Sequence, residues 1–348
     1  MRIRGATRAR AWAERLSAPL KRQAAILIYH RVFEAAFDPQ ELCVSPAHFG
    51  DHLEILQAGY RVVPVTDLAE AARTGALERG MIAVTFDDGY ADTLAFAKPA
   101  LESHRVPATV FAVSGTLESE AIFWWDRLER VLLRPGRLPE VLSLGAGDET
   151  VHIQLGRWAH LGGDEFERLR GWVTSIPEDP TPRHTAYRAI WQRMRVLPHA
   201  EREELLLVLE SQAADLAPLP DGTRSLRTGE LRELVASPFV EIGAHTVRHE
   251  VLAALPADRQ RQEIEGSRAA LAAALGRPVR TFSYPYGARS DYTPETARLV
   301  REAGFACACA NFHGLVRRGT DVFQLPRVVI RDWNGPTFAR RLRIWMGC

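Results

Sequence analysis

The sequence has almost no excess of charge of either sign, because 44 lysines and arginines are balanced by 43 aspartates and glutamates, leaving a formal net charge of +1. A chain without a net field of one sign has no general attraction for nucleic acid. We therefore predict no nucleic-acid partner. Arginines do gather at both ends, within residues 1–22 and 340–343. They predict a basic N-terminal helix over residues 1–22 and leave weak association with a membrane surface open.

Long hydrophobic runs are also missing. The first twenty residues carry arginines throughout and contain no continuous apolar segment of the signal-peptide type. The apolar run Ala24 to Tyr29 is much too short to cross a bilayer, which takes about 20 residues. We therefore expect neither a signal peptide nor a transmembrane helix. A cytoplasmic protein follows as the expectation, with attachment to the membrane periphery as the alternative.

Cysteine is scarce, with only four residues, at positions 43, 307, 309 and 348. No Cys-x-x-Cys pair of the metal-binding type is present. Cys307 and Cys309 would point to the same face of an expected strand, too far apart along it for easy bridging. The spacing thus argues against a disulfide between them and favours a reducing compartment.

Short apolar runs alternate with helix-like segments over most of the chain. Strands that alternate with helices predict parallel pairing, and seven or eight such units predict a (β/α) barrel, complete or incomplete. Ser45-Pro46 and Thr293-Pro294 are typical helix starts, and Gly276 and Gly304 are typical helix stops. The predicted strands are residues 24–29, 61–63, 81–86, 108–113, 239–243, 281–284, 305–309 and 325–330.

This alternation breaks off between about residues 117 and 225, which we interpret as a largely helical inserted subdomain. The barrel is then built from two segments, 23–116 and 226–348. The inserted stretch contains five tryptophans, at positions 124, 125, 158, 172 and 191. They favour a small hydrophobic core that also contacts the barrel, with a sugar-stacking surface as the alternative.

Two adjacent carboxylates, Asp87 and Asp88, follow directly on an apolar strand and precede Gly89. Adjacent acids repel each other unless a cation or a proton lies near them. Gly89 permits a sharp turn that lets both acids face one cleft. Taken alone, the segment is equally compatible with a functional pair of acids and with an ordinary Asp-Asp-Gly turn.

Two histidines, His245 and His249, follow another apolar strand. Residues at i and i+4 can bind one ion if the chain between them turns helically. A histidine pair at this spacing also occurs by chance, and a buried histidine is more often hydrogen-bonded than metal-bound. One aspartate and two histidines would leave coordination positions open for water, as a hydrolytic metal requires.

A third block, Phe282 to Gly287, ends a strand with a proline-glycine turn. Taken alone it is a turn with aromatic packing. Placed after the other two blocks, it can supply a wall of the site and a backbone N–H donor.

The three blocks in this order resemble the polysaccharide deacetylase family, also called the NodB-homology domain or carbohydrate esterase family 4. The resemblance covers roughly residues 23–116 and 226–335 and implies a distorted (β/α) barrel. The family motif Thr-Phe-Asp-Asp-Gly matches at 85–89, which implies that Asp87 is the general base and Asp88 a metal ligand. The motif His-(Ser/Thr)-x-x-His matches at 245–249, which implies that His245 and His249 are the other ligands.

The sequence departs from the family pattern at two positions, so the contact of the base and the catalytic acid must come from other residues. The third family motif is Arg-x-Pro-Tyr, but Ser283 stands at the arginine position, so we take Arg327 as the candidate contact of the base. The proline and tyrosine are present, and Tyr286 is expected to offer its backbone N–H to the oxyanion. No late Leu-x-His motif supplies the catalytic acid. Tyr29-His30 instead resembles the exopolysaccharide-deacetylase branch, in which this motif is displaced to the N-terminus, so His30 is the expected acid and a structural histidine is the alternative.

The resemblance implies a metal-dependent hydrolase that removes N-acetyl groups from amino sugars of a polysaccharide, oligosaccharide or lipid-linked glycan. Zinc is the expected divalent metal, with cobalt, nickel, iron and manganese as alternatives. Tyr284 and Pro285 are expected to line the substrate groove, and Trp333 either lines it as well or takes part in ordinary packing. The alternatives are a non-catalytic glycan-binding homologue, or a deacetylase or amidase for a non-polymeric acetylated substrate.

Overall fold

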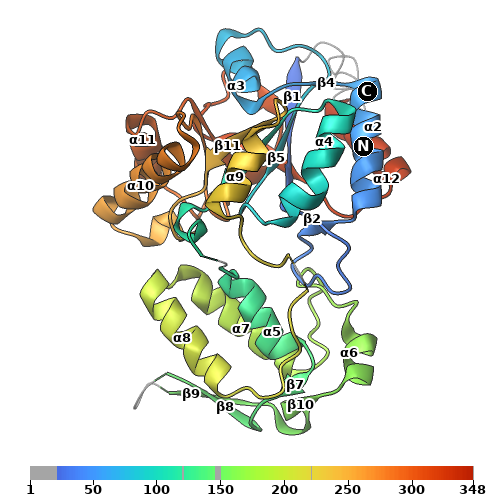
Figure 1. Cartoon of the computed structure of the whole chain (residues 1–348), viewed down its shortest axis with the longest axis vertical. Helices are drawn as coiled ribbons and strands as arrows, with labels where there is room; N and C mark the ends of the chain where they lie inside the picture. Colours follow the sequence, from blue (N-terminus) through green and yellow to red (C-terminus); the bar gives the residue numbers. More distant parts are fainter. Residues whose placement is uncertain (1–21, 120, 146–149, 221, 348) are drawn as a thin grey trace, which may run out of the picture.

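The computed structural model describes residues 22–119, 121–145, 150–220 and 222–347. The basic helix predicted for residues 1–22 therefore lies, apart from Arg22, outside the described residues. Figure 1 shows two lobes, with a sheet and its covering helices in the larger one and helices α5 to α8 with short strands in the smaller one.

The larger lobe is a closed barrel of seven parallel strands. Strand β1 pairs with β5 on one side and with β15 on the other, which closes the ring. This confirms the predicted (β/α) barrel and decides in favour of a closed one with seven strands. The barrel strands, in order around the ring, are β1 (Gln23–Tyr29), β5 (Met81–Phe86), β6 (Ala108–Ala112), β11 (Val240–Ala244), β12 (Thr281–Ser283), β13 (Cys307–His313) and β15 (Leu325–Val329).

One of the eight predicted strands, at residues 61–63, does not belong to the barrel. Strand β4 (Arg61–Val62) pairs only with Met81 and Ile82 of β5, whereas β6 begins its pairing with β5 at Val84. Strand β4 thus occupies the part of the β5 edge that β6 leaves free, so the ring closes without it. Three other short strands lie outside the ring: β2 (Arg31–Val32), β3 (Cys43–Val44) and β14 (Val316–Arg317).

Helices surround the barrel, and the predicted starts and stops are confirmed. Ser45 and Thr293 accept hydrogen bonds from backbone N–H groups of the first helical turns. Gly276 directly follows α10 and Gly304 lies two residues after the end of α11, with positive φ angles of 65° and 80°. The helices of this lobe are α2 (Pro46–Gly59), α3 (Val65–Thr74), α4 (Lys98–His104), α9 (Thr228–Val235), α10 (Ala257–Leu275), α11 (Pro294–Glu302) and α12 (Gly335–Met346).

The barrel strands are buried on both faces, which explains why they form continuous apolar runs in the sequence. On β1, Ala24 and Ile26 belong to one hydrophobic cluster, together with alternate residues of β5 and β13 and the side chains of α3. Ala25, Leu27 and Tyr29 belong to the other cluster, with the helices that surround the barrel. The alternation follows from the period of two in a strand and separates the barrel interior from the layer beneath the helices.

The smaller lobe has its own hydrophobic cluster. Trp124, Trp125 and Trp172 are buried within it and Trp191 packs against it, so the core interpretation is confirmed for four of the five tryptophans. Trp158 is half-buried and does not belong to this cluster. The lobe is largely helical, as predicted, but it also contains two small antiparallel sheets. Its elements are α5 (Trp124–Leu133), β7 (Gly136–Arg137), β8 (Val141–Leu144), β9 (Val151–Gln154), β10 (His160–Leu161), α6 (Gly163–Leu169), α7 (Pro182–Val196) and α8 (His199–Ser211).

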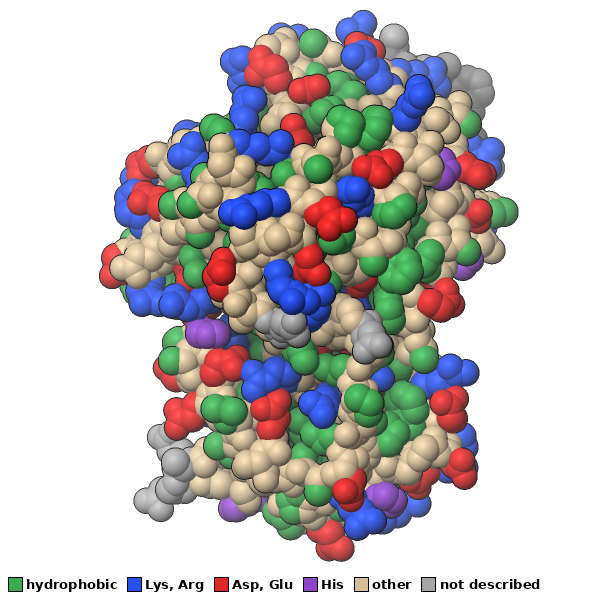
Figure 2. Space-filling view, in the orientation of Figure 1, with side chains coloured by type: hydrophobic (Ala, Val, Ile, Leu, Met, Phe, Trp, Pro, Cys, Tyr) green, Lys and Arg blue, Asp and Glu red, His purple; other side chains and the backbone are tan. Residues whose placement is uncertain are grey.

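The surface shows no large region of one charge on the face seen in Figure 2, where basic and acidic side chains are interspersed. This distribution agrees with the nearly balanced composition. Within the described ranges, no helix combines the length and the apolar character needed to cross a membrane.

A cluster of buried charges lies at the boundary between the two lobes. Arg31 of β2 pairs with Asp92 at 2.7 Å, and Glu129 of α5 pairs with Arg134 at 2.6 Å. Asp126 accepts a hydrogen bond of 2.7 Å from the hydroxyl of Tyr90. Burial raises the pKa of both Asp92 and Asp126 to about 6 and that of Glu129 to about 8. At pH 7 Glu129 is therefore largely protonated, whereas Asp92 and Asp126 are largely ionised.

We predict that Glu129→Gln removes part of the pH dependence of stability. The pKa of Glu129 in the fold, about 8, lies above the value of about 4.3 expected in an unfolded chain. Its contribution to stability is thus complete at low pH and is lost as pH rises toward 8. Urea unfolding should show that the wild type loses at least about 1 kcal/mol more than the glutamine variant between pH 5 and 8. Parallel pH profiles would show that Glu129 is ionised in the fold.

Candidate active site and metal centre

Every second residue of a barrel strand faces the interior, and at the C-terminal strand ends these inward-facing positions are occupied by polar residues. On β1 the series that contains Ala24 and Ile26 reaches His30, and on β5 the series of Met81 and Ala83 reaches Asp87. The same period of two therefore carries side chains from separate strands into one opening of the barrel.

A glycine makes room for this arrangement two residues before His245. A Cβ atom at Gly243 would lie 2.5 Å from the hydroxyl of Thr281 and closer still to the ring of Phe111. No larger residue fits there unless the barrel interior shifts.

Asp88, His245 and His249 are buried, and their potential ligand atoms lie within 4.8 Å of one another. Oδ1 of Asp88 is 3.5 Å from Nε2 of His245 and 3.3 Å from Nε2 of His249. Ligands placed ~2.1 Å from a tetrahedral zinc ion are ~3.4 Å apart, so these separations fit a metal of that size. Nδ1 of His245 lies 2.8 Å from the carbonyl of Ser283, which fixes the ring so that Nε2 faces the site.

The pKa values of the two histidines differ. Burial lowers the pKa of His245, but the carboxylates of Asp87 and Asp88 outweigh burial and raise it above the ordinary value. His249 lies between Trp125 and Tyr286, with ring centroids 4.8 and 4.7 Å away. Burial lowers its pKa to about 4, so His249 is neutral at pH 7, as a metal ligand must be.

The backbone is strained at several residues of the motifs. Asp88, Thr246, His249 and Tyr286 all have positive φ angles, between 55° and 71°. Such angles are uncommon outside glycine and cost free energy that the surrounding structure must offset. Four of the seven such non-glycine residues in the described chain lie in these motifs, which indicates a functional constraint on this part of the backbone.

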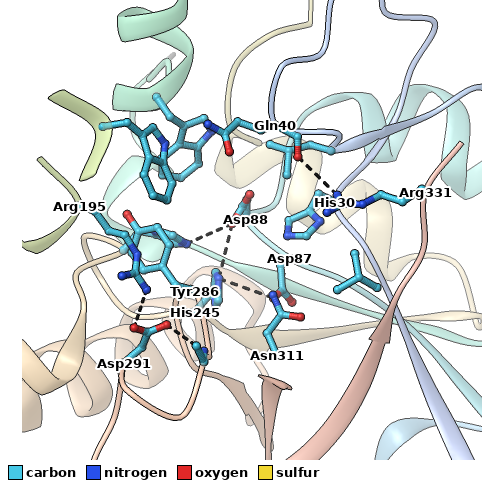
Figure 3. Close-up of a pocket in the computed structure, with 16 residues that line it drawn as sticks. His30, Gln40, Asp87, Asp88, Arg195, His245, Tyr286, Asp291, Asn311 and Arg331 are labelled. Carbon is cyan, nitrogen blue, oxygen red and sulfur yellow. Dashed lines mark hydrogen bonds and ion pairs between the residues drawn. The ribbon is translucent and has the colours of Figure 1, made fainter. Parts of the chain in front are cut away.

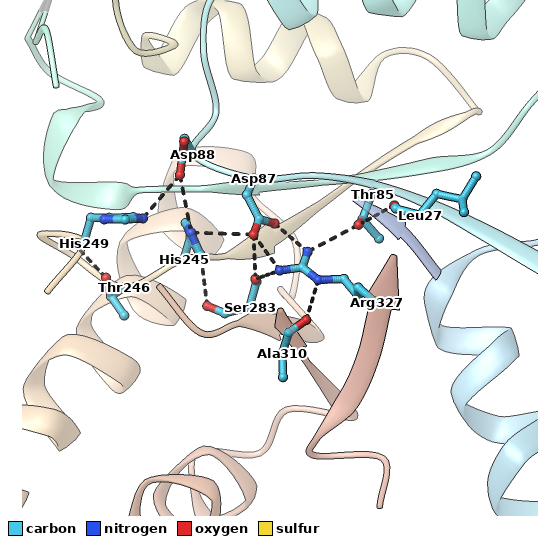
Figure 4. Close-up of polar contacts among 10 residues, drawn as sticks. All are labelled: Leu27, Thr85, Asp87, Asp88, His245, Thr246, His249, Ser283, Ala310 and Arg327. Atoms are coloured by element: carbon cyan, nitrogen blue, oxygen red, sulfur yellow. Dashed lines mark hydrogen bonds and ion pairs between the residues drawn. The ribbon is translucent and has the colours of Figure 1, made fainter. Parts of the chain in front are cut away.

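Asp87 lies in a buried hydrogen-bond network, shown in Figure 4. Nη1 and Nη2 of Arg327 donate to its two carboxylate oxygens at 2.7 and 2.6 Å. Ser283 donates to Oδ2 of Asp87 at 3.1 Å and accepts from Arg327 at 2.8 Å. Arg327 is itself held by the carbonyl of Ala310 at 2.7 Å and by Thr85 at 3.3 Å. The carboxylate orientation is therefore determined from two sides.

The same contacts set the charge of Asp87. Burial raises the pKa of this carboxyl, but Arg327 and His245 outweigh burial and hold the pKa below its ordinary value. Asp87 is therefore ionised at neutral pH.

The arginine that contacts Asp87 comes from β15 and not from position 283, where the family motif has its arginine. Strand β13 lies between β12 and β15 in the barrel, and the long side chain of Arg327 crosses the interior to reach Asp87. Ser283 leaves room for the guanidinium and also binds it. The serine at the family's arginine position and Arg327 on β15 thus form one arrangement.

A cavity of about 360 Å³ opens above the metal-binding residues (Figure 3). The inserted lobe supplies part of its wall, including Trp125, Trp191 and Arg195. The residues that line the cavity are His30, Gln40, Leu42, Asp87, Asp88, Trp125, Trp191, Arg195, His245, His249, Tyr286, Ala288, Asp291, Asn311, Val329 and Arg331.

His30 and Tyr286 both line this cavity. Figure 3 shows His30 on one side of Asp88 and Tyr286 on the other. Burial lowers the pKa of His30 even though Asp88 and Asp87 act in the opposite direction, so the ring is neutral at pH 7 in the resting protein. Burial also raises the pKa of the Tyr286 hydroxyl to about 12, so the phenol does not ionise.

The three residues predicted for the substrate groove do not line the cavity. Tyr284 is fully buried in the layer beneath the helices, stacks on Tyr292 and donates its hydroxyl to the carbonyl of Phe323. Pro285 is buried in the turn that follows. Trp333 packs toward Trp345 of α12, with ring centroids 5.9 Å apart. The structure thus does not bring these three residues to the cavity wall. Tyr284 points to the helix layer because positions along a strand alternate between the interior and that layer.

Sequence reasoning missed most of the remaining wall. Trp191 and Arg195 lie on α7, about fifty residues before the nearest motif, at His245. The sequence offers a sugar-stacking role for Trp191 only as an alternative, and no local pattern marks Arg195. Asn311 and Arg331 continue the inward series of β13 and β15, a signal that strand periodicity contains but that requires the strand register.

We compared the chain with known protein families and solved structures. The chain matches the polysaccharide deacetylase family over residues 74–138 and 205–308. No curated protein matches it significantly. The chain is similar in structure to the deacetylase PplD of Streptococcus pyogenes in complex with acetate, with a TM-score of 0.57, 15% identity, and 94% of this chain and 99% of that one covered.

Two further structures share the fold. IcaB from Ammonifex degensii is 18% identical, with a TM-score of 0.56 and coverage of 94% of this chain and 97% of that chain. The BpsB deacetylase domain from Bordetella bronchiseptica is 17% identical, with a TM-score of 0.50 and coverage of 89% and 96%. The chain combines a closed (β/α) barrel with the motifs at residues 85–89 and 245–249, which lie at the C-terminal ends of the strands. The chain belongs to the polysaccharide deacetylase family.

Proposed function

We propose that the protein is a metal-dependent hydrolase that removes N-acetyl groups from amino sugars of a glycan. The observation that carries this proposal is the position of Asp87 beside the ligand cluster, with Oδ2 only 3.9 Å from Nε2 of His245. A carboxylate that is ionised, oriented by Arg327 and adjacent to a metal site is suited to activate a water molecule.

Asp88, His245 and His249 would hold the divalent ion. Nitrogen and carboxylate oxygen donors suit zinc, with cobalt, nickel, iron and manganese as alternatives. When bound, the ion supplies Lewis-acid polarisation of the acetyl carbonyl and lowers the pKa of a water molecule.

The residues of the chain supply the proton transfers. Asp87 accepts a proton from the water whose oxygen attacks the acetyl carbon. The backbone N–H of Tyr286 stabilises the negative charge that develops on the carbonyl oxygen. His30 delivers a proton to the sugar nitrogen as the C–N bond breaks, which yields acetate and a free amine. Because His30 is neutral in the resting protein, it must acquire this proton in the course of the reaction.

The assignment of a glycan substrate is supported by family membership and by the shape of the cavity. Trp125 and Trp191 on its wall are the kind of aromatic surface against which sugar rings stack. Both tryptophans come from the inserted lobe, which therefore contributes to substrate binding in this proposal.

We expect the purified protein to release acetate from N-acetylglucosamine oligomers only when metal is bound. Treatment with a chelator should abolish release, and added zinc should restore it. Acetate is measured enzymatically, and the free amine is measured in parallel to separate N-deacetylation from O-deacetylation. If the metal-loaded protein binds acetylated glycans but releases no acetate from any of them, it is a glycan-binding homologue and the proposal is wrong.

A further inference from the structure

One charged side chain in the cavity has no charged partner. Asp87 is paired with Arg327, and Asp291 is paired with Arg195 at 2.5 Å. Asp88 faces the two histidines. Arg331 also lines the cavity, but in the described part of the chain no carboxylate lies within ion-pair distance of it. The wall therefore offers one guanidinium that forms no ion pair in the described structure.

The acids nearest to Arg331 are engaged elsewhere. Asp332, its neighbour in sequence, accepts hydrogen bonds from the backbone and hydroxyl of Ser45 and contacts His48. The carboxylate of Asp38 accepts the N–H groups of residues 42 and 43 at 2.9 and 2.8 Å. Neither side chain is free to turn toward Arg331 without losing these bonds.

The guanidinium of Arg331 is held in one orientation. Its Nη1 donates to the backbone carbonyls of Gln40 and Glu41. No hydrogen bond in the described structure involves Nε or Nη2, and the side chain is half-buried at the cavity wall. Nε and Nη2 form one edge of the planar group, and such an edge binds a carboxylate or a phosphate through two parallel hydrogen bonds.

Arg331 lies on the side of the cavity where we place the leaving sugar. Figure 3 shows Arg331 beside His30, on the side of Asp88 opposite to Tyr286 and Arg195. If His30 protonates the sugar nitrogen, as proposed above, Arg331 faces the sugar and its substituents, whereas the acetyl group faces the metal-binding residues.

We propose that Arg331 binds an anionic oxygen group, a carboxylate or a phosphate, carried by the glycan near the acetylated amine. The inference rests on the proposed function for the identity of the substrate. It assigns to the enzyme an acidic glycan in preference to a neutral one.

The test compares neutral N-acetylglucosamine oligomers with two acidic probes, N-acetylglucosamine 1-phosphate and an oligomer that alternates N-acetylglucosamine with glucuronic acid. For at least one acidic probe, we expect the wild type to show a kcat/KM higher than for the neutral oligomer. Arg331→Gln should lower that value by roughly 10- to 100-fold, mainly through KM, and should lower the value for the neutral oligomer by a clearly smaller factor. The probe that responds identifies phosphate or carboxylate. Arg331→Lys should restore part of the effect, because it keeps the charge but not the paired donors.

The matched control is Arg259→Gln, which removes one exposed positive charge on α10, away from the cavity. It should leave the preference unchanged. Calorimetric binding of the same probes to the wild type and to Arg331→Gln gives a readout independent of turnover. Binding that depends on Arg331 without acetate release would contradict the proposed function alone. Equal affinity and equal kcat/KM for both proteins with both acidic probes would overturn the inference alone.

Discussion

Replacement of Asp87 by asparagine is expected to abolish acetate release while the protein still binds metal. Asparagine keeps an oxygen for Arg327 and Ser283 but cannot accept a proton from water. Loss of a general base lowers kcat by about 10²- to 10⁴-fold. Metal analysis after dialysis, together with acetate release at saturating substrate, measures both properties.

The matched variant is His245→Ala, which removes one of the three ligand side chains. It should lose the bound metal and therefore all activity, and added zinc in excess should restore little. Equal metal content in the two variants would contradict the division of roles between Asp87 and the ligand cluster.

Removal of Arg327 should have the largest effect on stability of any single change in the site. The side chain is completely buried, and its replacement by methionine leaves the carboxylate of Asp87 buried without its cation. Breaking a buried ion pair from one side costs about 3–5 kcal/mol. The pKa of Asp87 should also rise, so that activity is lost at a higher pH on the acid side than in the wild type. Urea unfolding and a pH profile of kcat/KM measure the two effects.

A double-mutant cycle separates the pair from the rest of the network. Arg327→Met combined with Asp87→Asn removes both charges and should be destabilised by clearly less than the sum of the two single variants. Arg327→Lys keeps the charge but loses the two-pronged contact, and should lie between the wild type and the methionine variant. Additive costs in the cycle would show that Arg327 stabilises the barrel independently of Asp87.

Several features of the fold could be predicted because their causes are local. A strand buried on both faces must be apolar along its whole length, so residues 81–86 and 108–112 could be recognised from composition alone. Helix starts at Ser45 and Thr293 depend on side chains that bind the backbone within one turn. The choice between seven and eight barrel strands could not be predicted, because it depends on which part of the β5 edge remains free after β6 has paired.

The two opening motifs of the site are local in the same sense. Asp88 follows its strand directly, and His245 and His249 share a single turn, so the spacing of residue types was enough to propose a metal site. The contact between Arg327 and Asp87 is different, because 240 residues separate them and only strand order brings them together. The family resemblance predicts an arginine beside the base, but only the three-dimensional structure shows that Arg327 takes this position.

The sequence by itself thus determined the barrel class, the helix ends and the two separate motifs that contain Asp88 and the pair His245 and His249, because each depends on periodicity or spacing within a few residues. Only the tertiary structure decided that seven strands close the ring, that Trp125, Trp191 and Arg195 of the inserted lobe reach the cavity, and that Tyr284 and Trp333 do not. The physical reason is that strand register and the packing of one lobe on the other select which side chains share a cavity. Both depend on residues far apart in the chain.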